Sequence, residues 1–161
     1  MEQQARVVVG VDGSEASREA LRWALRQAAL TGAVIEAVAC WQWPAAAGGF
    51  APYEDFDMST PTRLHAEAEL AQALSETGLS VEVRLVVVEG YPAGALVAHG
   101  AGAELLVVGS RGHGTLRGVM LGSVGLHCVT HATCPVVVIH PRPAGSSDGE
   151  ARTAEKPAVT V

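Results

Sequence analysis

Lysine is almost absent from this chain of 161 residues: the single one, Lys156, lies in a polar stretch near the C-terminus. The rest of the chain therefore cannot supply a catalytic lysine that forms a Schiff base, nor the lysine that a phosphate-binding P-loop requires. Asparagine is missing altogether, so the chain carries no acceptor for N-glycosylation.

Cysteine is also scarce, with Cys40, Cys128 and Cys134 each in an apolar context. An odd, sparse set of this kind excludes a secreted domain that is stapled by disulfides. The first six residues show no basic region followed by a long apolar stretch, and no later apolar run approaches the ~18 residues that span a bilayer. We therefore expect a cytoplasmic protein with no membrane partner.

Positive charge is in deficit, because 11 Lys and Arg stand against 17 Asp and Glu, for a net charge of −6. Such a chain has no excess of basic side chains to neutralise a phosphate backbone, so we expect no nucleic-acid partner. Small anionic ligands stay open, because backbone amides bind them without any net positive charge.

The composition predicts one globular domain, since 48 % of the residues are hydrophobic and only 17 % are charged. We place this domain at residues 1–140. Residues 141–161 are rich in proline, glycine, serine and charge, and we expect a disordered C-terminal tail there.

Along the domain, β-branched apolar runs alternate with helical patterns. Strands are predicted at 6–11, 33–41, 81–88, 104–109 and 135–139, and helices at 15–30, 61–77, 92–99 and from 123 onward. This alternation is typical of α/β proteins, and right-handed crossovers leave few arrangements of the strands. We predict a single doubly wound parallel sheet of five strands, in the flavodoxin-like order 3-2-1-4-5, with helices on both faces.

The first helix carries alanines at four-residue intervals, Ala16, Ala20, Ala24 and Ala28, opposite a row of arginines. This spacing predicts a small-residue face that packs closely on the sheet. Residues 42–60 interrupt the alternation with prolines, glycines and aromatic side chains. They indicate a mobile loop or lid, whose aromatic residues either pack within the loop or cover a purine pocket.

A glycine-rich segment follows the fourth strand, where ligands bind in open α/β sheets. Gly109 ends the strand, and Gly112 lets backbone amides turn toward a bound anion without a Cβ in the way. Gly122 does the same just before a helix, and Ser123 either caps that helix or donates its hydroxyl to a phosphate. Together these residues predict a phosphate cradle.

The pattern Gly109-x-x-Gly112, nine residues, then Gly122-Ser123 resembles the nucleotide-binding motif of the universal stress protein family, in its ATP-binding branch. The order of strands and helices agrees over roughly residues 5–140. The resemblance implies that ATP binds with its triphosphate on this loop. It further implies that Asp12 contacts the ribose, that the backbone of Ala39 holds the adenine, and that Val124 lines the site.

Asp12 and Arg111 can also be interpreted from the residues themselves. Asp12 ends a strand that we expect to be central, where a carboxylate accepts hydrogen bonds from ribose hydroxyls, although Asp12-Gly13-Ser14 is also an ordinary turn sequence. Arg111 either adds charge near the phosphates or is solvated. The family places a divalent cation, such as Mg²⁺, with the nucleotide in some members. Since Asp12 is the one carboxylate that we place near the phosphates, we expect no metal site on the protein itself.

Other motifs are weaker. Gly112-x-Gly114-x-x-x-Gly118 has the wrong spacing and follows the wrong strand for a dinucleotide fold, and no serine has the two flanking glycines of a hydrolase elbow. The best metal candidate is the run His127-Cys128-x-x-His131-x-x-Cys134. A simpler interpretation than a zinc site is that the histidines form a polar stripe and the cysteines are small buried hydrophobic residues.

We expect a nucleotide-dependent regulator of the stress response, with at most slow ATP hydrolysis and no catalytic residues. Near the glycine loop the sequence offers no lysine, no paired carboxylates and no evident base. Two alternatives stay open: an enzyme acting on an adenine nucleotide with His113 or His127 as its proton-transfer group, and a dimeric scaffold that binds no nucleotide.

The last strand has a consequence for assembly. In the order 3-2-1-4-5, the valine-rich strand Pro135–Ile139 lies at the edge of the sheet with unpaired backbone groups. An uncovered apolar edge favours pairing with a second copy, so we predict a homodimer through this strand.

Overall fold

The computed structural model describes residues 4–42, 57, 59–112 and 121–141. Strands and helices alternate along them, each within about two residues of its predicted bounds. They are β1 (Arg6–Val11), α1 (Glu15–Thr31), β2 (Val34–Trp41), α2 (Ser59–Thr77), β3 (Val83–Glu89), α3 (Pro92–Gly100), β4 (Leu105–Gly109), α4 (Ser123–His131) and β5 (Val136–Ile139).

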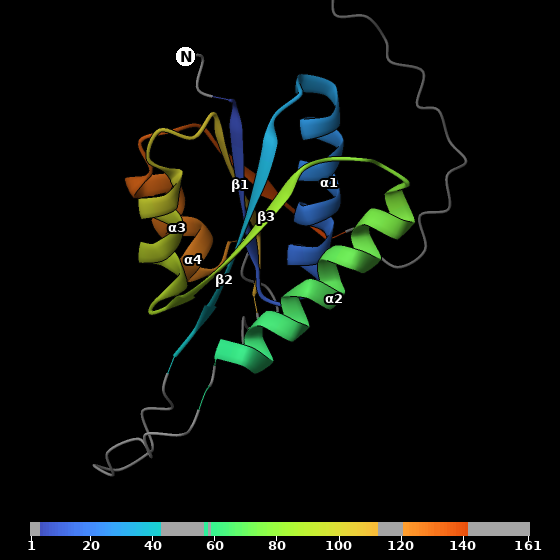
Figure 1. Ribbon diagram of the computed structural model, residues 1–161. Coiled ribbons are helices and arrows are strands. Elements are labelled where there is room, and N and C mark those ends of the chain that lie inside the picture. Colours follow the sequence, from blue (N-terminus) through green and yellow to red (C-terminus); the bar gives the residue numbers. More distant parts are fainter. Residues whose placement is uncertain (1–3, 43–56, 58, 113–120, 142–161) are drawn as a thin grey trace, which may run out of the picture.

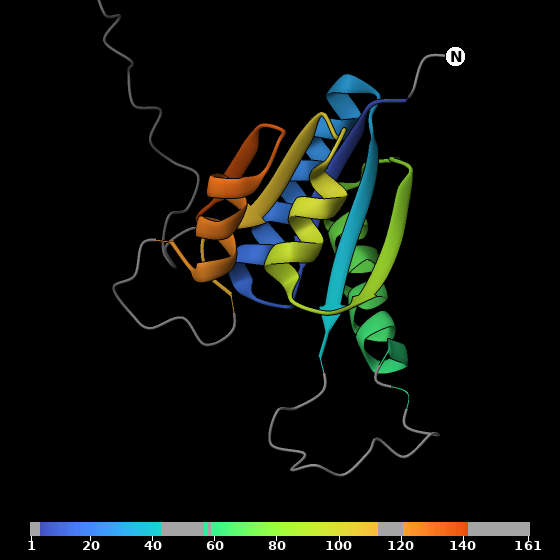
Figure 2. The same cartoon turned by 90° about the vertical axis from the view of Figure 1, so that its left-hand side faces the viewer.

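The strands form one parallel sheet in the order β3-β2-β1-β4-β5, which confirms the predicted topology. Helices α1 and α2 cover one face of the sheet, and α3 and α4 cover the other (Figure 1). Turned by 90°, the molecule shows β4, β1, β2 and β3 side by side behind α3 and α4 (Figure 2). Because all strands are parallel, their carboxyl ends lie at the same edge of the sheet.

The predicted alanine face of α1 is confirmed, because Ala16, Ala20, Ala24 and Ala28 are all buried in the structure. Small side chains bring the helix axis close to the sheet, and Leu21 and Leu25 fill the remaining space with no more than 1 % exposure. The helix ends at Gly32 in the left-handed conformation, with φ 74°, and the Gly32 N–H bonds to the Ala28 carbonyl at 2.8 Å.

Helix α2 begins at Ser59, two residues before the predicted start at Pro61. The exposed carboxylate of Asp57 explains the difference, because it accepts hydrogen bonds from the backbone N–H groups of Ser59 at 2.8 Å and Thr60 at 3.3 Å. These bonds satisfy amides that have no partner within the helix. Hydrogen bonds from Ser59 and Thr60 also lower the pKa of Asp57 to about 2.

Two predictions lie mostly outside the described residues: the mobile loop at 42–60, of which 43–56 and 58 are not described, and the tail, of which 142–161 are not described. Within the described ranges, no helix combines the length and the apolar character that crossing a bilayer requires.

Candidate functional site

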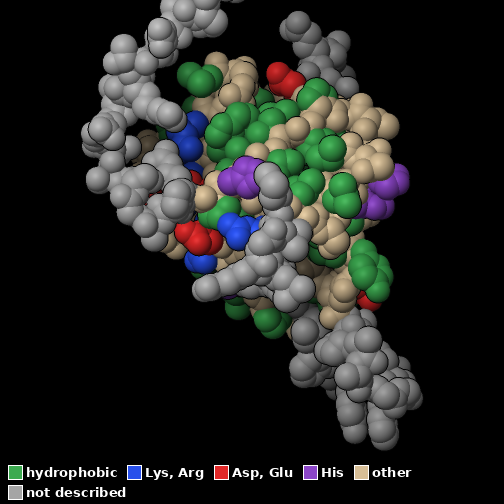
Figure 3. Space-filling view, turned by 180° about the vertical axis from the view of Figure 1, so that it is seen from behind, with side chains coloured by type: hydrophobic (Ala, Val, Ile, Leu, Met, Phe, Trp, Pro, Cys, Tyr) green, Lys and Arg blue, Asp and Glu red, His purple; other side chains and the backbone are tan. Residues whose placement is uncertain are grey.

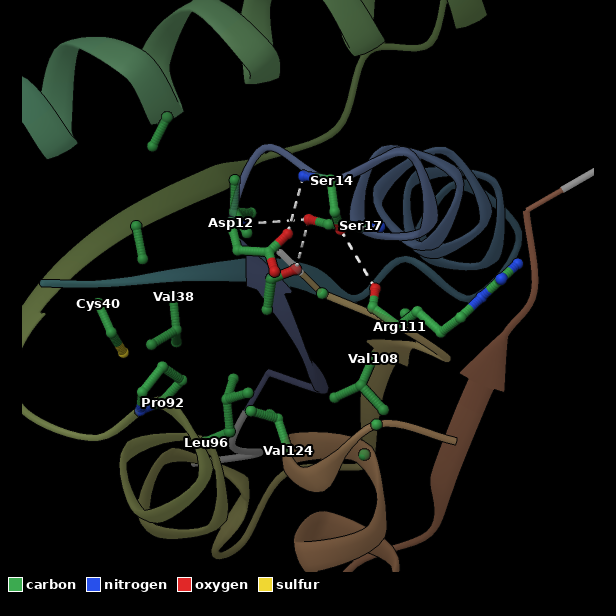
Figure 4. Close-up of a pocket in the computed structure, with 18 of the residues that line it drawn as sticks. Asp12, Ser14, Ser17, Val38, Cys40, Pro92, Leu96, Val108, Arg111 and Val124 are labelled. Atoms are coloured by element: carbon green, nitrogen blue, oxygen red, sulfur yellow. Dashed lines mark hydrogen bonds between the residues drawn. The ribbon is translucent and has the colours of Figure 1, made fainter. Parts of the chain in front are cut away.

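A cavity of about 610 Å³ opens at the carboxyl ends of β1, β2 and β4 (Figure 4). This volume lies within the range typical of small-molecule sites. The connection from β1 to α1, the first turns of α2, α3 and α4, and the segment after β4 complete its walls. All the predicted site residues line it: Asp12, Ala39, Gly109, Arg111, Gly112, Gly122, Ser123 and Val124.

Asp12 is held in place on the polar side of the cavity. Its Oδ1 accepts a hydrogen bond from the Ser14 N–H at 2.9 Å, and its own N–H donates to Ser17 Oγ at 3.1 Å. The buried Ser17 hydroxyl donates in turn to the Gly10 carbonyl at 3.1 Å. The turn after β1 therefore presents an exposed, oriented carboxylate to the cavity (Figure 4).

Ser14 joins this turn to the glycine-rich segment. Its hydroxyl caps α1 by accepting a hydrogen bond from the Ser17 N–H at 3.1 Å, and it donates to the Arg111 carbonyl at 3.3 Å. Sequence reasoning missed Ser14 and Ser17 as members of the site. The N-cap pattern, a serine ahead of an alanine-rich helix, was the available signal.

Two motif glycines leave little room for a Cβ atom. A Cβ on Gly109 would lie 2.7 Å from the carbonyl carbon of Ala16 and 2.9 Å from the Ser17 nitrogen, both in the backbone of α1. A Cβ on Gly112 would lie 2.7 Å from Asp12 Oδ2. Neither glycine has a positive φ, so the constraint at both positions is one of space. It is rigid at Gly109, which faces backbone atoms, and weaker at Gly112, which faces the end of the Asp12 side chain.

The start of α4 differs from one of the two predicted roles of Ser123. Gly122 is the N-cap, with φ −73° and ψ 167°, and no side chain makes a capping hydrogen bond. Ser123 is the first helical residue, so its exposed hydroxyl does not cap the helix. The Gly122 N–H donates to the Ser110 carbonyl at 2.7 Å, and the Ser110 N–H donates to the Ile139 carbonyl of β5 at 2.7 Å. These bonds hold the start of α4 beside β4 and β5.

The other side of the cavity is apolar. It is formed by side chains on the α3 and α4 face of the sheet: Val38, Cys40, Pro92, Leu96, Val108 and Val124. Burial raises the pKa of the Cys40 thiol to about 11, so this thiol stays protonated at neutral pH and offers no thiolate nucleophile.

The backbone of β2 supplies polar groups beside this apolar wall. The Ile35 N–H donates to the backbone carbonyl of Glu82, just before β3, and the Trp41 carbonyl accepts from the Gly90 N–H, just after β3. The backbone groups of odd-numbered residues of β2 therefore face β3. Successive residues of a strand face opposite neighbours, so the backbone of Ala39 also faces β3. The carbonyl of Cys40 faces the β1 side, one position past the last residue of β2 that pairs with β1.

Arg111 contributes its backbone rather than its charge to this arrangement. Its carbonyl accepts the bond from Ser14, while its exposed side chain extends away from the cavity (Figure 4).

The cysteine and histidine run on α4 does not form a cluster. The rings of His127 and His131 stack with their centroids 4.1 Å apart, and Cys128 is buried in the core between the sheet and α3 and α4. Across the described part of the chain, no group of three or more His, Cys, Asp or Glu side chains is arranged to hold a metal ion. His127 does not line the cavity, and His113 lies outside the described residues.

The sequence of this chain matches one protein family over most of its length. The model of the universal stress protein family matches residues 5–140. Universal stress protein Rv2623 of Mycobacterium tuberculosis is 37 % identical over 145 residues, which cover 84 % of this chain and 45 % of that protein. A universal stress protein of Mycolicibacterium smegmatis is 34 % identical over 141 residues, covering 83 % and 47 %. The chain thus spans about half the length of these relatives.

Solved structures share the fold. A universal stress protein in complex with cAMP has a TM-score of 0.63 and 28 % identity, covering 86 % of this chain and 98 % of that one. UspA from Lactobacillus plantarum has a TM-score of 0.62 and 22 % identity, covering 86 % and 99 %. The family model covers residues 5–140, and the strand order and the cavity at the carboxyl ends of the strands are consistent with that match. The chain therefore belongs to the universal stress protein family.

Proposed function

We propose that this protein binds an adenine nucleotide, ATP by preference, in the cavity at the carboxyl ends of β1, β2 and β4. The observation that carries the proposal is the division of this one cavity into an apolar side and a polar side that meets the glycine-rich segment. A purine fits the first and a ribose phosphate the second. The related structure in complex with cAMP supports the same ligand class.

Each part of the nucleotide has a matching wall. The base fits between Val38 and Leu96, where the resemblance implies a contact with the Ala39 backbone and the strand register favours the carbonyl of the next residue, Cys40. Asp12 accepts from the ribose hydroxyls. The phosphates lie against the backbone of Gly112 and the first amides of α4, which have no acceptors within that helix.

The chemistry favours a binding protein that acts as a regulator, with at most slow hydrolysis. Asp12 is the one carboxylate among the described residues that line the cavity, with Oδ1 bonded to Ser14 and Oδ2 against Gly112. It is poorly placed to activate a water molecule or to hold Mg²⁺ by itself, so any cation would be bound mainly by the phosphates.

We further propose that residues 1–140 form the nucleotide-binding domain, that 141–161 form a disordered tail, and that the protein acts in the cytoplasm. The composition of the two segments supports the first two of these proposals.

The test begins with protein as purified, which is denatured so that any released nucleotide can be identified. ATP is then titrated calorimetrically into the emptied wild type and into Gly122→Val. We expect wild type to bind and the variant to lose binding, because a branched side chain at the N-cap of α4 obstructs the approach to its first amides. The extended backbone at Gly122 is a conformation that valine also adopts, so the substitution introduces no backbone strain there.

Gly122→Ala is the matched control, with a smaller side chain and a smaller expected loss of affinity. Absence of released nucleotide and of binding heat in a folded wild type would refute the nucleotide proposal and leave the dimeric scaffold.

We also propose a homodimer through β5. This strand pairs with β4 on one side and lies at the edge of the sheet, and Val136–Ile139 are all partly exposed. Figure 3 faces this side of the molecule, where hydrophobic side chains gather. Exposed apolar edges favour pairing between copies.

The oligomeric state is measured by sedimentation velocity at micromolar concentration, where we expect a dimer. Val138→Pro is expected to shift the protein toward monomer, because the odd-numbered residues of β5 hydrogen-bond to β4 and proline at 138 removes a backbone donor from the free edge. Sedimentation of the wild type as a monomer would contradict the proposed assembly.

A further inference from the structure

The central strand β1 carries no side chain where it reaches the cavity. Gly10 of β1 pairs with Val38 of β2. On the other side of β1, the register that pairs Val9 with Val107 continues to Val108 of β4. Gly10 and the two valines beside it, Val38 and Val108, all line the cavity. The row across the three strands therefore has a valine on each side and only hydrogen in the middle.

Leu96 of α3 occupies the place above Gly10. A Cβ added at Gly10 would lie 3.1 Å from Leu96 Cδ1, 3.4 Å from Cδ2 and 3.8 Å from Cγ. Leu96 is 3 % exposed and belongs to the same core cluster as Val38 and Val108. Figure 4 shows these three side chains at the apolar side of the cavity. The missing side chain at Gly10 therefore lets Leu96 lie close against the sheet.

The position of Leu96 affects the room at this side of the cavity. Carbon atoms in ordinary contact lie about 3.5–4.0 Å apart, so a Cβ at position 10 would push the end of the Leu96 side chain off the sheet. The core is close-packed, whereas the cavity is open space that Leu96 borders. The displaced side chain therefore moves toward the cavity and makes its apolar side shallower.

We propose that Leu96 determines the size of the base that this cavity accepts, and that Gly10 is the positioning residue that acts through Leu96. The inference rests on the proposed function and deepens it: the depth that these two residues leave favours a purine over a pyrimidine. A base of two rings buries more apolar surface in a deep pocket than a base of one ring, and affinity rises with that buried area.

The first test compares ATP with CTP, titrated calorimetrically into the full chain as wild type and as Gly10→Ala. Adenine and cytosine both carry an exocyclic amino group, so the comparison reports chiefly on the size of the base. We expect wild type to bind ATP at least about tenfold more tightly than CTP. Gly10→Ala is expected to lower ATP affinity about fivefold and to leave CTP affinity within about twofold, because the smaller base does not reach the displaced Leu96.

Gly94→Ala is the matched control on α3. A Cβ at Gly94 meets nothing within 4 Å, and Gly94 is not among the residues that line the cavity. We expect this variant to leave both affinities unchanged.

The second test is a rescue. Leu96→Val removes the two Cδ atoms, which are the atoms nearest to a Cβ at position 10. In the Leu96→Val background we therefore expect Gly10→Ala to change ATP affinity by less than about twofold, since the added Cβ has little left to displace. A general weakening of β1 by alanine would not be relieved in this way.

Leu96→Phe reaches the same space from α3 and leaves β1 unchanged. We expect it to lower ATP affinity about tenfold and CTP affinity by no more than about twofold, because the larger ring fills the room that the purine needs. This variant tests the depth of the cavity even if Gly10→Ala does not fold, and thermal unfolding shows which variants are folded.

Equal losses for ATP and CTP in the folded variants, or no loss for either, would overturn the selection by size. Equal affinity of wild type for ATP and CTP would overturn it too, while leaving nucleotide binding in place. Additive losses from Gly10→Ala and Leu96→Val would overturn the positioning of Leu96 by Gly10. If wild type binds neither nucleotide, the proposed function fails instead, so the two failures are distinguishable.

Discussion

Replacing Gly109 with alanine is expected to destabilise the fold by about 2–3 kcal/mol. The added Cβ would lie 2.7 Å from the Ala16 carbonyl carbon, 2.9 Å from Ala16 Cβ and 2.9 Å from the Ser17 nitrogen. These atoms belong to the first turn of α1, which the Ser14 cap holds, so no side-chain rotation relieves the overlap. Either β4 or the start of α1 must shift.

The measurement is chemical denaturation, in which the change in midpoint at constant slope gives the loss of stability. Gly94→Ala on α3 is the matched control, because a Cβ there meets nothing within 4 Å. That substitution should be neutral or stabilising by up to about 1 kcal/mol. Equal stability of the two variants would show that the contact between β4 and α1 does not require glycine.

Gly112→Ala is expected to act on the ligand rather than on the fold. Its Cβ would lie 2.7 Å from Asp12 Oδ2, a movable side-chain atom, so the carboxylate is displaced while the backbone stays. We expect a roughly tenfold to hundredfold loss of ATP affinity, since the displaced group contacts the ribose in the proposed complex. The thermal unfolding midpoint should stay close to that of the wild type.

A double-mutant cycle isolates this mechanism. In an Asp12→Ala background the carboxylate is already gone, so adding Gly112→Ala should change the affinity little further. Calorimetric titration of the four proteins provides the measurement. Independent, additive losses would mean that Gly112 serves the ligand directly, through its backbone, as the sequence alone had suggested.

Local patterns in the sequence determined most of the fold. The alternation of β-branched runs with helical segments was enough to predict the strands and helices, because periodicity is a short-range constraint. Right-handed crossovers left few arrangements of the strands, and the predicted order 3-2-1-4-5 is confirmed. The alanine face of α1 followed from four-residue spacing in the same way. The glycine pattern also located one wall of the cavity, since Gly109, Gly112 and Gly122 lie close in sequence.

Residues far apart in sequence needed the tertiary structure. His65 on α2 belongs to no motif, and only the packing of α2 against β2 brings it to the cavity that also contains Asp12 and Gly112. The sequence assigned Gly112 to an anion, while the structure adds the contact with Asp12. Gly109 likewise proved to be required by the backbone of α1.

One physical cause separates the features that the sequence predicted from those that needed the tertiary structure. Hydrophobic period and turn chemistry act between neighbours along the chain, so the sequence by itself determined the elements, their order and the position of the glycine-rich segment. Steric room beside a glycine, the burial of Ser17 and the direction of the Arg111 side chain depend on atoms brought together across the fold. Those features only the tertiary structure decided.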